Sequence, residues 1–123
     1  MQDLYKYVLD KIKSATGMKP YTDYIPTDKT FPYIQLQFPN VLPNGFGELN
    51  LMQLDIWDKN VSKAQVENIS DEIDKIFNRL NDTTADFSLQ IYRNTPYRLN
   101  IPDTDMEIRR RQLRYIIKIY RKE

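Results

Sequence analysis

Carboxylates and arginines are the side chains of this sequence that could do chemistry. The chain contains no His and no Cys, which removes Ser-His-Asp and Cys-His nucleophiles and the metal sites built from those ligands. Asp71, Glu72 and Asp74 lie close together, but neighbouring helical residues point in different directions, so we expect a solvated helix face rather than a metal site. The three glycines fit no phosphate-binding loop. We therefore predict no enzyme activity, no metal and no cofactor.

A second acidic pair precedes the densest basic cluster of the chain. Its carboxylates could pair with the nearby arginines or bind a cation, and we favour pairing between subunits. Basic residues interleaved with aromatics can also track a nucleic-acid backbone. Consecutive arginines on a strand point to alternate faces, however, so they cannot all meet one phosphate surface. The contact residues predicted here are Asp103, Asp105, Arg109, Arg110, Arg111 and Arg114.

Charge is unevenly distributed along the 123 residues. Residues 1–92 carry a net charge of −4 and residues 93–123 one of +5, although the whole chain is at +1. An anionic partner would fit the basic end, but complementarity within the chain or between subunits is the better explanation for a nearly neutral protein. The length suits one domain, 1–123. Without an apolar run long enough to cross a bilayer or a signal-peptide layout, we expect a soluble, intracellular protein and no membrane partner.

The elements that position the charged residues include two predicted amphipathic helices. In the first, Leu4, Val8 and Ile12 recur every four residues, and Gly17 supplies a stop signal. In the second, Ser62 and Gln65 have the spacing of a capping box, and an apolar stripe with steps of three and four continues to about Asn81.

Four strands are predicted by alternation of apolar and polar residues: 33–38, 49–57, 87–92 and 111–120. The first two form a hairpin, in which a phase change at Leu51-Met52 predicts either a bulge or a strand that is covered on both faces. Flexible loops are expected near 39–47 and 94–106. The predicted order is α-β-β-α-β-β, an α+β fold with a mixed, mostly antiparallel sheet and two helices packed on one face.

The hairpin tip carries three apolar residues, Val41, Leu42 and Phe46, with no obvious core to join. They either form a contact surface or fold back over their own sheet.

The order of elements resembles that of tail terminator (tail completion) proteins of long-tailed bacteriophages. The resemblance covers nearly the whole chain and depends on the opening helix, on the motifs Pro32-Tyr33-Ile34 and Leu54-Asp55-Ile56-Trp57, on the long helix that follows, and on the Asp-rich connection before a final apolar strand. No invariant functional residue carries over from that family. The contact residues above therefore remain inferences from this sequence.

The resemblance implies a hexameric ring, built from copies that are either monomers or rings when free, at the head-proximal end of the virion tail, with assembly in the host cytoplasm. Its partners would be the tail tube protein and the head-tail connector protein, and genome DNA would pass through without specific binding. A head-tail connector (neck) ring protein is the nearest alternative. A soluble module that binds a peptide by strand addition is another.

Overall fold

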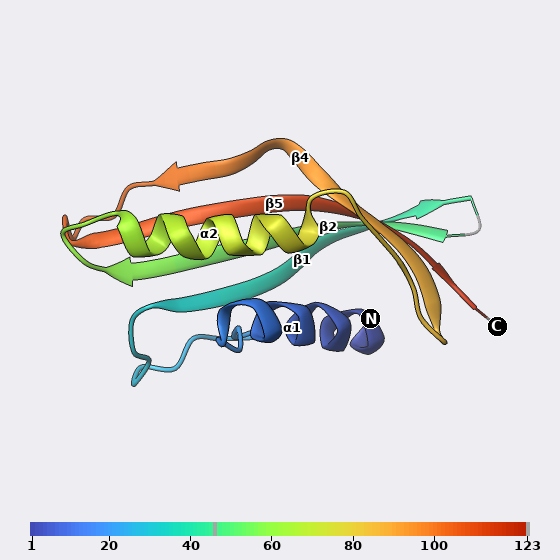
Figure 1. Ribbon diagram of the computed structural model, residues 1–123, viewed down its shortest axis with the longest axis horizontal. Coiled ribbons are helices and arrows are strands. Elements are labelled where there is room, and N and C mark those ends of the chain that lie inside the picture. Colours follow the sequence, from blue (N-terminus) through green and yellow to red (C-terminus); the bar gives the residue numbers. More distant parts are fainter. Residues whose placement is uncertain (46, 123) are drawn as a thin grey trace.

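A computed structural model describes residues 1–45 and 47–122. Two helices cover one face of a five-stranded sheet, whose strands are ordered β1-β2-β5-β4-β3 (Figure 1). All neighbouring strands are antiparallel. The α+β class and the α-β-β-α-β-β order are confirmed, with one added short strand. The elements are α1 (Gln2–Thr16), β1 (Tyr33–Asn44), β2 (Gly47–Lys59), α2 (Ala64–Phe77), β3 (Leu80–Thr83), β4 (Phe87–Ile101) and β5 (Ile108–Arg121).

Helix α1 forms as its periodicity predicts. Leu4, Val8 and Ile12 are fully buried in the core. Gly17 ends the helix in the left-handed region, at φ 75°, and donates its N–H to the Lys13 carbonyl over 2.8 Å. A residue without a Cβ adopts this backbone conformation at little cost, which explains the stop.

Helix α2 is shorter than its sequence pattern indicates. It has 14 residues, begins at Ala64 and ends at Phe77. The predicted capping box is wrong, because Ser62 lies before the helix and its Oγ accepts the Ala64 N–H over 3.1 Å. The predicted end near Asn81 is also wrong. Arg79 turns the chain at φ 61°, and Leu80–Thr83 then pair with β4 as the added strand β3.

The loop expected at 39–47 is largely strand. Strands β1 and β2 stay paired as far as Asn44 and Gly47, so the hairpin is a long arm (Figure 1). Its bulge lies on β1, where Phe38 and Pro39 oppose Met52 alone, and not on β2. Since β1 is an edge strand, its prolines cost no ladder hydrogen bond when their nitrogens face outward.

The connection expected at 94–106 is mostly strand as well. Strand β4 continues to Ile101, and a register shift between Arg93 and Arg98 accommodates Pro96. Only residues 102–107 connect β4 to β5. Beyond Ile91, β4 has no further partner on its β3 side among the described residues, which is where a proline is tolerated.

The core lies between the helices and one face of the sheet. Leu54, Leu113 and Ile117 from the sheet meet Ile73 and Phe77 from α2, all of them buried. On the opposite face, the described residues form no helix (Figure 1). Within the described part of the chain, neither helix is long and apolar enough to span a bilayer.

Candidate functional site

The helix-free face of the sheet carries an apolar groove. Leu49 on β2 lies opposite Leu42 on β1, and Leu51 on β2 lies opposite Ile116 on β5, so the four side chains share one face. The cavity above them has a volume of ≈ 220 Å³, and Asn40, Asn50 and Asn94 also line it. We call this surface the apolar groove. Small-molecule pockets are usually about 300–1,000 Å³, so the groove is sized for one or two side chains.

Two cations flank the apolar groove. Arg114 and Lys118 stand on either side of Ile116 along β5 and point to the same face, about 13 Å apart at strand spacing. Neither forms an ion pair with another residue in 1–45 or 47–122. The Lys118 ammonium lies 5.8 Å from the centre of the Tyr92 ring. Both charges remain available to a partner.

Among the residues that the structure describes, Asp55 is the one carboxylate on the strand positions of this face, and it pairs within its own chain. Its side chain is 1% exposed, and it accepts hydrogen bonds from Arg110 at 3.0 Å and from Gln112 at 3.1 Å. The Arg110 guanidinium also lies 4.6 Å from the centre of the Trp57 ring. Arg110, predicted as a contact residue, therefore has a structural role within the chain.

Arg111 likewise bonds within the chain, on the helix side of the sheet. It pairs with Glu67 of α2 and donates to the Asn100 amide oxygen over 2.6 Å. Arg98 adds bonds to Glu67 at 2.7 Å and to Asp71 at 2.8 Å. Sequence patterns did not indicate Arg98, because only the register of β4 brings it against α2.

The acidic side chains of α2 hold the helix to the sheet. Asp74, expected on a solvated face, is mostly covered and pairs with Arg93, whereas Asp71 is largely exposed despite its bond to Arg98. The described residues contain no group of three or more His, Cys, Asp or Glu that could hold a metal ion.

The connection between β4 and β5 forms a second distinctive surface, which we call the acidic loop: Asp103, Thr104, Asp105, Met106 and Glu107. Met106 is 86% exposed at its apex. Asp105 forms an ion pair with Lys59 at 3.5 Å. The hydrogen bond from the Glu107 N–H, together with Lys59, holds the pKa of Asp105 below its usual value.

Arg109 lies beneath the acidic loop and donates to the Val61 carbonyl over 2.9 Å. Within the described residues, neither Asp103 nor Asp105 pairs with any of the arginines at 109–111. Asp103 and Glu107 form no ion pair there, so two carboxylates flank Met106 without a cationic partner.

Two of the three predicted tip residues are exposed. Val41 is 44% and Leu42 is 58% accessible, and Leu42 also lines the apolar groove. Phe46 lies outside the described residues. Near its tip, the arm is tied to the rest of the molecule by Arg121, which pairs with Glu48 of β2 and with Asp3 of α1.

No protein-family model matches the sequence, and no match was found among curated proteins. Among solved structures, a chain from the virion of a native gene transfer agent particle has a similar structure, with a TM-score of 0.74. The similarity covers 97% of this chain and 95% of that chain at 11% sequence identity. At such low identity the similarity demonstrates a shared fold.

Proposed function

We propose that this chain is a structural protein of a phage-like virion, and specifically the tail terminator. It would form a ring, hexameric by resemblance, that caps the head-proximal end of the tail tube. The ring stops tube polymerisation and provides the surface on which the head docks. The observation that carries this proposal is a fold shared over nearly the full length of both chains with a component of a gene transfer agent virion.

The surfaces of the chain suit a structural role. Its arginine–carboxylate pairs join α2 to the sheet instead of forming a reactive site, and the sequence lacks His and Cys. The exposed features are an apolar groove and an acidic loop, which suit contacts with proteins.

Ending the growth of a tail tube requires a ring whose two faces differ from each other. Tube rings stack through heterologous contacts that do not close by themselves, so growth ends only when a ring with a non-complementary outer face is added. The partners of this ring are the tail tube protein on one side and the head-tail connector protein on the other. Genome DNA passes through the ring without specific binding.

Deletion of the gene for this chain from the genome that encodes the particle tests the function. Electron microscopy of the products should show overlong or headless tails, and expression of the protein in trans should restore normal particles. Tails of normal length on complete particles would refute the proposal. Tails of normal length that fail to join filled heads would identify a neck protein instead.

Light-scattering mass measurements with and without purified tail tubes provide a second test. A terminator adds a ring of copies to the tube end. A peptide-binding module remains monomeric in both conditions, which would contradict the proposal.

A further inference from the structure

The apolar groove and the acidic loop are complementary in both chemistry and charge. We infer that the acidic loop of one copy docks into the apolar groove of a second copy, with Met106 as the inserted side chain. Only the closure of these contacts into a ring depends on the proposed function. The contact itself is a property of the chain.

Met106 suits the apolar groove by size and by flexibility. The groove, at ≈ 220 Å³, has four apolar lining residues, Leu42, Leu49, Leu51 and Ile116, and three asparagines. A Met side chain is unbranched and adapts to irregular apolar gaps, and burying its apolar surface stabilises a contact. At 86% exposed, Met106 makes little use of its apolar surface within its own chain.

The flanking charges have opposite signs on the two surfaces. Arg114 and Lys118 border the groove, and Asp103 and Glu107 flank Met106. All four lack an ion-pair partner among the described residues. Lys59, Lys63 and Arg109 also lie near the loop, but Lys59 is engaged with Asp105. Docking would pair two cations with two carboxylates around an apolar centre, which favours specific association.

The acidic loop is held in shape before any contact forms. Asp103 accepts the Asp105 N–H over 3.0 Å, and Asp105 accepts the Glu107 N–H over 2.9 Å. The Glu107 carbonyl accepts the Asn60 N–H over 2.8 Å. A preformed loop loses less conformational entropy on binding, so more of its contact energy appears as affinity.

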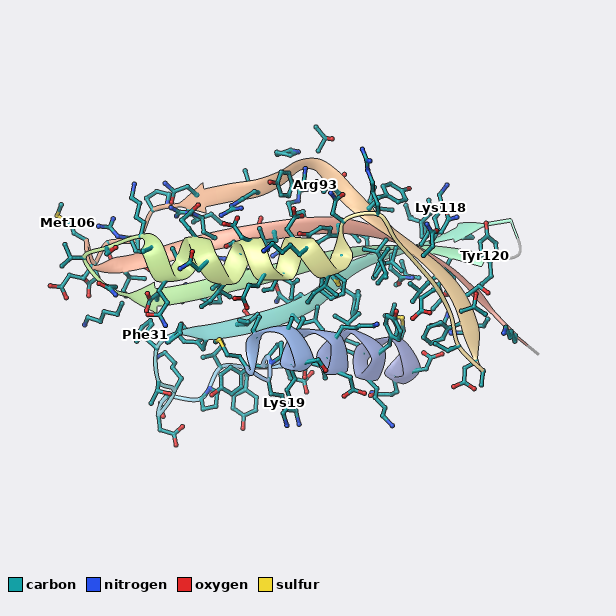
Figure 2. All side chains as sticks on the ribbon, viewed as in Figure 1. Lys19, Phe31, Arg93, Met106, Lys118 and Tyr120 are labelled. Carbon is teal, nitrogen blue, oxygen red and sulfur yellow. The ribbon has the colours of Figure 1, made fainter. Side chains whose placement is uncertain are left out.

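The two surfaces lie toward opposite ends of the molecule. Figure 2 shows Met106 at one end of the long axis, and Lys118 and Tyr120 toward the other. A chain with a loop at one end and its complementary groove toward the other associates head to tail. Such heterologous contacts generate a ring where the rotation between copies closes.

Nucleic acid is the competing occupant, since Arg114 and Lys118 have no ion-pair partner within residues 1–45 and 47–122. Between them lies Ile116, with Leu49 and Leu51 beside it. The other lining residues, Asn40, Asn50 and Asn94, are uncharged and add no cation to the groove. A phosphate surface gains nothing from an apolar centre, so the observations favour a protein segment.

Cysteine crosslinking tests the contact without background, because the natural chain has no Cys. The double variant Met106→Cys/Leu51→Cys should form intermolecular disulfides on mild oxidation, both as concentrated protein and in assembled particles. The control pair Tyr24→Cys/Leu51→Cys, which places a cysteine at an exposed position outside the acidic loop, should not. Absence of the crosslink in both preparations would overturn the inference.

Charge reversal in the double-cysteine background supplies the second readout. Arg114→Glu/Lys118→Glu, or Asp103→Lys/Glu107→Lys, should each lower the crosslink yield by more than about tenfold, and combining all four should restore it. The control Lys6→Glu/Lys11→Glu changes the same charge on α1 and should have no effect. If Arg114→Glu/Lys118→Glu instead abolishes retention on DNA resin and leaves the crosslink intact, the groove binds nucleic acid and the inference is wrong.

The outcomes separate this contact from the proposed function. A crosslink together with normal tails in the deletion strain would support the contact and refute the terminator role. Overlong tails in the deletion strain without any crosslink would do the reverse.

Discussion

The hydroxyl group of Tyr115 on β5 donates a hydrogen bond to the Asp74 carboxylate on α2 over 2.8 Å. Burial, together with this bond, raises the pKa of Tyr115 far above its usual value. Burial alone would raise the pKa of Asp74, but the hydrogen bonds from Arg93 and Tyr115 outweigh it and lower that pKa. A neutral phenol and an ionised carboxylate therefore join α2 to the sheet across physiological pH.

Tyr115→Phe should destabilise the protein by about 1–2 kcal/mol, because it removes a buried donor and leaves Asp74 with one partner fewer. The ring and its contact with Phe77, at 5.9 Å between centroids, are kept. The free energy of unfolding in urea measures the effect. Tyr24→Phe, at an exposed position, is the control, and an equal loss in both variants would contradict the assignment.

The Asp3–Arg121 pair makes stability depend on pH. The hydrogen bond from Arg121 lowers the pKa of Asp3 from 3.8 to about 2. The folded state therefore binds the proton less tightly than the unfolded state, so the contribution is full above pH about 4 and is lost as pH falls toward about 2. Because the pair is partly exposed, Asp3→Asn should cost less than about 1 kcal/mol at neutral pH. The melting temperatures of the two proteins should converge at low pH, and a constant difference would refute this explanation.

Asn50 lies on the helix side of β2, opposite Ile117 of β5, and is fully buried. Its amide oxygen and nitrogen have no hydrogen-bond partner among the described residues. Asn50→Leu should therefore stabilise the fold by about 1–2 kcal/mol, since it removes an uncompensated desolvation cost. Thermal unfolding measures the gain, and Asn81→Leu, at an exposed site, should show none. A lower melting temperature would mean that water or a partner group satisfies Asn50.

Arg79 adopts φ 61° in the turn between α2 and β3, although it carries a Cβ. This conformation costs a non-glycine residue about 1–2 kcal/mol. Arg79→Gly should raise the free energy of unfolding by about 1 kcal/mol. Lys75→Gly, in the last turn of α2, should lower it by a similar amount. If both variants destabilise the protein, the Arg79 side chain makes a contact that outweighs its strain.

Replacing Val41, Leu42 and Phe46 together with Ser should leave folding intact and abolish association. Val41 and Leu42 are exposed in the single chain, so their loss removes little buried apolar area there. Circular dichroism and urea midpoints report folding, and sedimentation of protein mixed with tail tubes reports association. A large drop in the urea midpoint would show that these residues belong to the core.

Much of the local structure can be predicted from particular residues. Leu4, Val8 and Ile12 with Gly17 determine α1 and its end, because helical periodicity and the left-handed stop are properties of a few neighbouring residues. Leu113, Tyr115, Ile117 and Ile119 likewise determine which face of β5 is buried. The lack of His and Cys in the sequence already removes the side chains on which many active sites depend.

Only the tertiary structure decides which distant residues become neighbours. Strand β5 inserts between β2 and β4, and its register places Ile116 beside Leu51, builds the apolar groove and leaves Arg114 and Lys118 on its borders. The same alternation points Arg110 and Arg111 to opposite faces, where each finds a partner within the chain. Prolines that indicate loops in the sequence are accepted in β1 because it is a sheet edge. The alternation of side chains between the two faces of a strand follows from local backbone geometry, so it can be predicted from the residues of that strand. Strand order and register depend on pairing between residues that are distant in the sequence.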